Sequence, residues 1–300
     1  MVGPFSTPLP HINQTSTEYV WNYHFYQDGS IEVEIRLTGI LSVYVSGDGE
    51  PSPFGTIVAP NINAHYHQHL FNIRIDPMID GLSNTVIESD IVPLEETAGS
   101  KDNFAGNGFQ VKESPITKET GRQYDYAKDR RWRIVNRSKP HYASGQSAGY
   151  SIGLKAGVLP FLGQPDGWAG KRAGLLKNTV WVVRDVEDGV AGGGSIRMWP
   201  AGRYVSQTRG EPGDSVCEWV KGGQKVIDED LLVFVNVGTT HIPRPEDWPV
   251  YAFLFFYCHS ILTYIQSLIV CQSSICRSPL SPIHSSRQIL ASTFLEVLTP

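Results

Sequence analysis

Residues 31–45, IEVEIRLTGILSVYV, decide the fold class of this 300-residue chain. The stretch opens with apolar and charged residues in alternation, which is typical of a β-strand with one face buried. A Gly-Asp-Gly turn at 47–49 follows it, and GTIVAPNINAHYHQHLFNIRI (55–75) continues with strand character. The pattern therefore predicts strands joined by turns, not helices.

The rest of the chain extends this pattern. The valine-rich stretches 178–186 and 230–238 predict further strands, and clusters of Gly, Pro and Asn separate them. Helical periodicity is scarce, and we expect at best one short helix at VPLEETAG (92–99) and one around Ala148. The fold class is all-β: a large antiparallel β-sandwich with long loops and hairpin arms.

Composition limits the classes of function. Lys and Arg number 25 and Asp and Glu 30, a formal net charge of −5, and such mild acidity gives no reason to expect a nucleic-acid partner. The N-terminus lacks the basic and apolar regions of a secretory signal, and the last residues, Leu-Thr-Pro, are not a peroxisomal tripeptide. The compartment stays open, with cytoplasm and peroxisome as the two expectations.

HYHQHLFNIRIDPMIDG (65–81) carries three histidines at alternate positions. Side chains at i, i+2 and i+4 of a strand point the same way, so His65, His67 and His69 are expected to share a face. Neutral imidazoles suit copper and zinc. The alternative is a polar strand face with hydrogen-bonded histidines, and the spacing alone leaves both open. A third ligand would have to come from elsewhere in the chain, or from His65.

Several ordered segments together resemble the copper/topaquinone amine oxidase family. They cover roughly residues 18 to 250 and are FYQDGSIEVEIRLTGIL (25–41), NAHYHQHLFNIRIDPMIDG (63–81), GNGFQVKE (106–113), RRWRIVN (130–136), MWPAGRYVSQTRG (198–210) and DEDLLVFVNVGTTHIPRPEDWPV (228–250). The resemblance implies oxidation of primary amines by dioxygen to an aldehyde, ammonia and hydrogen peroxide. It also implies a catalytic domain of β-sandwich fold and a homodimer with hairpin arms.

The resemblance also implies metal ligands. His67 and His69 match the family's H-Q-H copper motif and His241 matches its third ligand, whereas His65 falls outside the motif. A second site for calcium or manganese would use Asp76, the Pro77 carbonyl, Asp230 and the Leu231 carbonyl. For Asp76, an ion pair with Arg74 is the competing interpretation.

The catalytic groups of the family are not matched. Its quinone cofactor, topaquinone, forms from a tyrosine, and the aligned position here is Thr17, which has no ring to oxidise. Tyr19 lies two residues later, about 6–7 Å along a strand, and is not expected to replace it. The family's catalytic aspartate lies far upstream, and only sixteen residues precede Thr17. We therefore expect an inactive fragment of a primary-amine oxidase; the alternative is a non-catalytic copper-binding or dimerising β-sandwich protein.

Both ends depart from the family, so we divide the chain into a non-matching segment 1–17, a partial catalytic domain 18–250 and a non-matching tail 251–300. The tail begins within an apolar run, 250–270, whose His259, Thr263 and Gln266 weaken its interpretation as a membrane helix. An intron or frameshift translated into protein is the hypothesis we prefer for this composition change. RDVEDGVAGGGSIRM (184–198) could form a hairpin arm or a loop.

Overall fold

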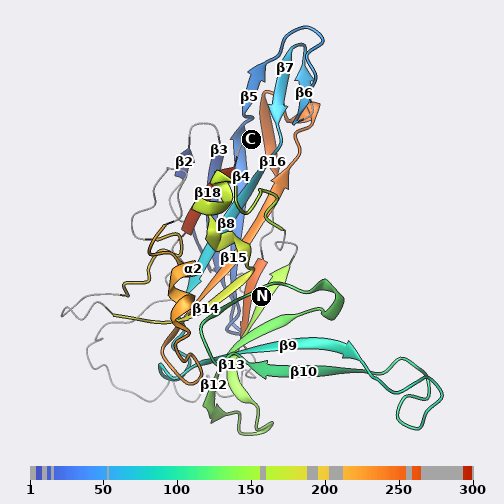
Figure 1. Cartoon of the computed structure of the whole chain (residues 1–300), viewed down its shortest axis with the longest axis vertical. Helices are drawn as coiled ribbons and strands as arrows, with labels where there is room; N and C mark the ends of the chain where they lie inside the picture. Colours follow the sequence, from blue (N-terminus) through green and yellow to red (C-terminus); the bar gives the residue numbers. More distant parts are fainter. Residues whose placement is uncertain are drawn as a thin grey trace.

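The computed structural model describes the backbone of residues 5–8, 12–14, 17–52, 54–155, 160–187, 195–202, 212–254, 259–264 and 293–298. Side chains are described from residue 17 to residue 250, apart from 53, 155–159, 188–194 and 203–211. Within these ranges the chain is built from antiparallel β-sheets, as predicted (Figure 1).

The first sheet is the largest, and its main path runs β1-β3-β4-β17-β13-β12-β9-β10. Strands β2 and β16 pair with β3 and β4 respectively. The bounds are β1 Phe5–Pro8, β2 Ile12–Gln14, β3 Thr17–Phe25, β4 Ile31–Ile40, β9 Thr85–Pro93, β10 Phe109–Pro115, β12 Arg131–Pro140, β13 Ser147–Lys155, β16 Val250–Leu254 and β17 His259–Tyr264.

Two smaller sheets complete the sandwich and its extension. The five-stranded sheet has the order β11-β14-β15-β8-β18, with β8 His67–Ile75, β11 Thr120–Arg122, β14 Val180–Arg184, β15 Leu231–His241 and β18 Thr293–Leu298. The three-stranded sheet has the order β5-β7-β6, with β5 Val43–Val45, β6 Gly55–Ala59 and β7 Ile62–His65.

The main core lies between the first sheet and the five-stranded sheet. Alternate residues of β3 and β4, among them Trp21 and Ile35, face Phe71 and Ile73 of β8, and all four are buried. Trp132 of β12 is fully buried in the same core. Because each sheet buries an apolar face against the other, the two sheets form one sandwich.

The helices are short and lie outside this core. They are α1 Trp168–Arg172, α2 Val216–Trp219 and the 3-10 turns η1 Tyr126–Lys128, η2 Gly174–Lys177, η3 Val220–Gly222 and η4 Pro245–Asp247. Residues from η2 and α2, with Leu232 and Phe234 of β15, form a second apolar cluster on the other face of the five-stranded sheet. Strands β8 and β15 are consequently buried on both faces along most of their length.

Both helices predicted from the sequence are wrong. Residues 92 and 93 end β9 and 94–99 form turns, while Ala148 is buried in β13 opposite Asn136 of β12. Strand pairing and burial override the weak helical preference of these segments. The strands predicted at 178–186 and 230–238 are confirmed as β14 and β15.

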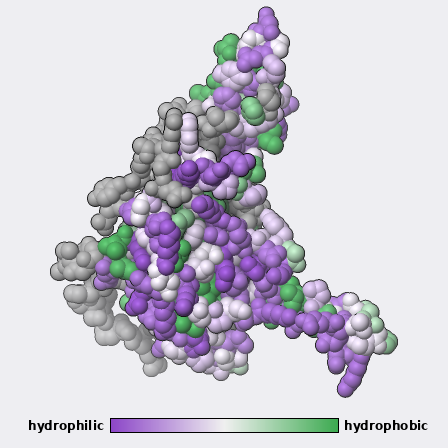
Figure 2. Space-filling view, viewed as in Figure 1, coloured by the Kyte–Doolittle hydropathy of each residue, from purple (hydrophilic) through white to green (hydrophobic). Residues whose placement is uncertain are grey.

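Two extensions project from the sandwich (Figure 1). The three-stranded sheet extends at the top of the view, and the hairpin of β9 and β10 projects at the lower right. On the face shown in Figure 2, hydrophilic residues predominate and hydrophobic ones are scattered over both extensions. The stretch 184–198, predicted to form a hairpin arm or a loop, contains an antiparallel bridge between Glu187 and Ser195, and residues 188–194 lie outside the described residues.

Part of the apolar run 250–270 forms strands. Its residues 250–254 are β16 and its residues 259–264 are β17, and both pair with β4. The remainder of the run lies outside the described residues. None of the helices in the described part of the chain combines the length and apolarity needed to cross a bilayer.

The sandwich core makes a direct prediction. Phe71 is fully buried and its ring meets Tyr19 and Trp21 edge to face, at centroid distances of 5.6 and 5.4 Å. We expect Phe71→Ala to lower the free energy of unfolding by about 3–5 kcal/mol in urea titrations, since it leaves a cavity. Tyr142→Ala, at an exposed position between β12 and β13, should change it by less than about 0.5 kcal/mol. Equal losses in the two variants would contradict this packing.

Candidate metal centre

Three histidines from two neighbouring strands converge inside the sandwich. His67 and His69 lie at the start of β8 and His241 ends β15; the antiparallel register places His241 opposite His67. The ring centroid of His67 lies 4.5 Å from that of His69 and 4.9 Å from that of His241. One nitrogen from each ring lies within 4.8 Å of the other two. Strand register therefore assembles a three-imidazole group from residues distant in sequence.

Gly238 permits this close approach of the two strands. It pairs with Leu70, and a Cβ atom at position 238 would lie 2.3 Å from the backbone oxygen of His69. Because that contact is with backbone, a side chain here would push β15 away from β8. The glycine thus helps to set the distance between the histidine strands.

The three imidazoles are buried and neutral. Burial, together with the neighbouring His67 and His241, lowers the pKa of His69 to about 2. Burial also lowers the pKa of His241 to about 4 and shifts the pKa of His67 downward. Neutral rings keep the lone pair that a metal ion needs, so the site is ready to bind a cation at neutral pH.

Hydrogen bonds orient two of the rings. His67 Nδ1 lies 2.9 Å from the His65 carbonyl oxygen, so a proton on Nδ1 is donated there and Nε2 is left as the ligand atom. His69 Nδ1 lies 2.9 Å from the Tyr19 hydroxyl, and the buried Nε2 of His69 has no hydrogen-bond partner among the described residues. His241 Nε2 lies 4.0 Å from a carboxylate oxygen of Asp247. This donor set fits copper or zinc.

His65 does not join the group, and the expectation that His65, His67 and His69 share one strand face is wrong. Strand β7 ends at His65 and β8 begins at His67. Tyr66 between them donates its backbone N–H to Phe54 O, outside either strand. The His65 ring instead stacks on Tyr44, with centroids 4.9 Å apart.

Thr17, the position aligned with the quinone-forming tyrosine, opens β3 and pairs with Gly39 of β4. Tyr19 follows on the same face of the strand and points toward His69. The described part of this face thus offers one tyrosine next to the histidines, and that tyrosine is not at position 17.

A group of three carboxylates lies at the other end of the histidine strands. Asp76 follows β8, Asp230 precedes β15 and Asp185 follows β14; one oxygen from each lies within 4.8 Å of the others. Burial raises the pKa of Asp230 to about 6, and repulsion from Asp185 and Asp76 contributes. Such mutual repulsion is relieved by a bound cation, and carboxylate oxygens suit calcium or manganese.

The competing interpretation of Asp76, an ion pair with Arg74, is present in the structure. Buried Arg74 lies 3.2 Å from its carboxylate, so Asp76 belongs to an ion pair and to the acidic group at once. Pro77 is buried and its carbonyl accepts a hydrogen bond from Asn84 at 3.4 Å. Leu231 is buried in the main core, next to Asp230.

Sequence reasoning missed Asp185 and the groups around the histidines. Asp185 donates its backbone N–H to Asp230 O, so it joins the acidic group through the pairing of β14 with β15. The sequence predicts both strands next to which the aspartates lie, but it does not show that these two strands are neighbours. The sequence also gives no sign that Asp247 lies near His241, because their distance depends on the turn η4.

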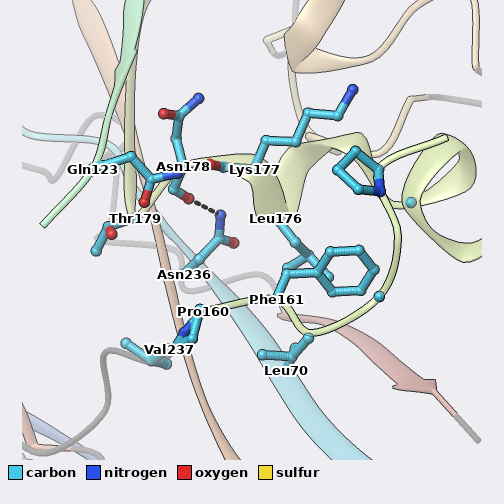
Figure 3. A pocket seen from close by; sticks show the side chains of 13 residues that line it. Leu70, Gln123, Pro160, Phe161, Leu176, Lys177, Asn178, Thr179, Asn236 and Val237 are labelled. Atoms are coloured by element: carbon cyan, nitrogen blue, oxygen red, sulfur yellow. Dashed lines mark hydrogen bonds between the residues drawn. The ribbon is translucent and has the colours of Figure 1, made fainter.

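A separate cavity of about 220 Å³ lies on the face of β8 that carries Leu70 (Figure 3). Its polar wall includes Asn236, which donates hydrogen bonds to Asn178 O and Leu175 O, each at 2.7 Å. Gln68, between the two histidines, points to this face and holds the adjoining loop by bonds to Pro160 O and Leu162 N. None of the predicted site residues lines this cavity.

Comparisons with known proteins point to one family. The sequence profile described as "Copper amine oxidase, enzyme domain" matches residues 15–258. A "Peroxisomal primary amine oxidase" from Pichia angusta is 37% identical over 237 residues, which are 78% of this chain and 33% of the relative. A "Histamine oxidase" from Arthrobacter globiformis is 34% identical over 78% of this chain and 32% of its own length.

Solved structures give the same result. The crystal structure of a copper-containing benzylamine oxidase from Hansenula polymorpha superposes with a TM-score of 0.76 and 29% identity, covering 85% of this chain and 38% of that one. An Aspergillus nidulans amine oxidase, at 22% identity and a TM-score of 0.70, shares the fold. The chain spans about a third of the length of the curated relatives it matches.

The acidic group gives a pH prediction for protein kept in a chelator. Because the folded-state pKa of Asp230 is raised above its ordinary value of 3.8 to about 6, its charge opposes folding at pH 8. We expect Asp230→Asn to raise the urea midpoint at pH 8. The gain should shrink as the pH falls through 6 and vanish below about 4, where the carboxyl is protonated in both states. Asp102→Asn, at an exposed position, is the control. A gain in the urea midpoint of Asp230→Asn that does not change with pH would contradict the repulsion among the three carboxylates.

Proposed function

This chain belongs to the copper amine oxidase family, and from that premise we propose that His67, His69 and His241 form its copper site. The observation that carries the proposal is the meeting of three buried, neutral imidazoles, with one nitrogen of each within 4.8 Å of the others. When bound, copper would supply the redox chemistry of the family. The protein contributes a buried pocket in which hydrogen bonds orient the rings of His67 and His69.

The family resemblance implies oxidative deamination of primary amines to an aldehyde, with ammonia and hydrogen peroxide as the other products. We propose that this chain does not carry out that reaction, because Thr17 occupies the position of the quinone-forming tyrosine. A threonine side chain has no aromatic ring from which topaquinone could form. Tyr19 is held by its bond to His69 and lies about 6–7 Å further along the strand.

A second cation site is part of the proposal. Asp76, Asp185 and Asp230 supply the carboxylates. The family resemblance adds the carbonyls of Pro77 and Leu231 as further oxygen candidates. Calcium or manganese is the class of ion that such oxygen donors bind. The raised pKa of Asp230 supports this reading, since a cation would relieve the repulsion.

The alternative function is a non-catalytic copper-binding protein that acts as a homodimer. The hairpin of β9 and β10 supports it, because this arm projects from the sandwich (Figure 1) and leaves Phe104 82% and Phe109 69% exposed. Exposed aromatic residues on a projecting arm are typical of an interface. Molar mass from light scattering, compared between wild type and Phe104→Ser/Phe109→Ser, distinguishes a dimer from a monomer.

Of the two compartments left open by the sequence, we propose the peroxisome. The support is that relatives from Pichia angusta and Nicotiana tabacum carry the word peroxisomal in their names.

Copper titration tests the assignment of the ligands. We expect the purified chain to bind close to one equivalent of copper, and His67→Ala or His241→Ala to abolish this binding because each removes a third of the donor set. His65→Ala is the matched control, since its ring stacks on Tyr44 and should leave copper binding unchanged. Loss of copper in the His65 variant, or retention in the His241 variant, would refute the assignment.

The absence of turnover is tested separately. The copper-loaded chain should release no hydrogen peroxide with methylamine or benzylamine, because no quinone can form at Thr17. A coupled peroxidase assay measures this, with a complete amine oxidase as the positive control. Peroxide formation that depends on the amine would show that another residue provides the organic cofactor.

A further inference from the structure

We propose that Tyr19 is a positioning residue for the copper site: its hydroxyl holds His69 in the tautomer that directs Nε2 toward His67 and His241. This inference rests on the proposed copper site and extends it to a side chain from the opposite sheet. Tyr19 lies on β3, fifty residues before His69 on β8, and the distance between the Tyr19 hydroxyl and His69 Nδ1 is 2.9 Å.

Packing leaves the Tyr19 side chain little freedom. It is 1% exposed, and its ring meets the His69 ring edge to face at a centroid distance of 5.7 Å. On its other side the ring meets Phe71 at 5.6 Å. A hydroxyl fixed in this way offers the imidazole an acceptor at one place only, so the His69 ring has one preferred orientation.

The chemistry of imidazole requires such an acceptor. In a neutral ring, one nitrogen carries the proton and the other carries the lone pair that binds a metal. The Tyr19 oxygen accepts the proton of Nδ1, which leaves the lone pair on Nε2. That nitrogen is buried and has no hydrogen-bond partner among the described residues, so it is the atom available to copper.

His69 differs from His67 in the source of its acceptor. The acceptor for Nδ1 of His67 is the backbone carbonyl of His65, which a side-chain substitution does not remove. Nδ1 of His69 depends on a side chain, so the contribution of this orienting bond can be measured by removing one oxygen atom. Loss of an orienting partner outside the ligand set typically weakens metal affinity 10–100-fold.

The role also separates Tyr19 from Thr17. Both residues lie on one face of β3, and the family resemblance assigns the cofactor position to residue 17. Tyr19 acts on the metal through His69 and needs no chemical modification. Its contribution therefore persists in a chain that has threonine at position 17.

The test compares Tyr19→Phe with Tyr23→Phe, a tyrosine on the same strand and the same face that packs against the main core. Copper affinity is measured by competition with a chelator of known affinity, and the cupric site is examined by electron paramagnetic resonance. We expect Tyr19→Phe to bind copper 10–100-fold more weakly with altered copper hyperfine splitting. Tyr23→Phe should match wild type in both measurements, and urea titration of the metal-free proteins reports any difference in stability.

The outcomes are distinct. Unchanged affinity and an unchanged spectrum in Tyr19→Phe would overturn this inference while leaving the copper site intact. Failure of the wild-type chain to bind copper would overturn the proposed function itself. Should Tyr19→Phe not fold, ¹⁵N-edited spectra of the zinc-loaded wild-type protein decide: a proton on Nδ1 of His69 supports the inference, and a proton on Nε2 overturns it.

Discussion

The register between β8 and β15 is the constraint on which the site depends. Pairing His241 with His67 places three imidazoles within bonding reach of one ion, and a shift of one residue would turn alternate side chains to the other face. The register is fixed by burial, because alternate residues of both strands, such as Phe71 and Val235, belong to the main core. The apolar packing of the sandwich and the geometry of the metal site are therefore consequences of the same pairing.

Burying polar rings in such a core has a cost that the surrounding groups offset. A buried nitrogen without a partner costs free energy, and the structure supplies acceptors for His67 and His69 on the side away from the other rings. The remaining nitrogen of His69 has no hydrogen-bond partner among the described residues. Metal binding at the proposed site would consequently be coupled to the stability of the fold, because the ion would satisfy groups that folding has taken out of water.

The sequence predicts much of this structure, for identifiable reasons. Alternation at 31–45 and the valine-rich runs predict strands correctly. Burial of one face of a strand produces alternating apolar and polar residues, and burial of both faces produces a continuous apolar run. The convergence of His241 with His67 and His69 follows from the family resemblance, since nothing local in the chain links them. His65 was misplaced because the break at Tyr66 depends on a backbone hydrogen bond to another loop. Asp185 and the role of Tyr19 depend on which strands are neighbours, and spacing along one chain does not contain that information.

Anomalous diffraction at the copper edge, from crystals of the copper-loaded chain, tests the central claim most directly. The account predicts a single strong copper peak bonded to one nitrogen each of His67, His69 and His241, with Nε2 as the ligand atom of His69. A peak that omits His241, or that lies at His65 or among the carboxylates of Asp76, Asp185 and Asp230, would contradict it.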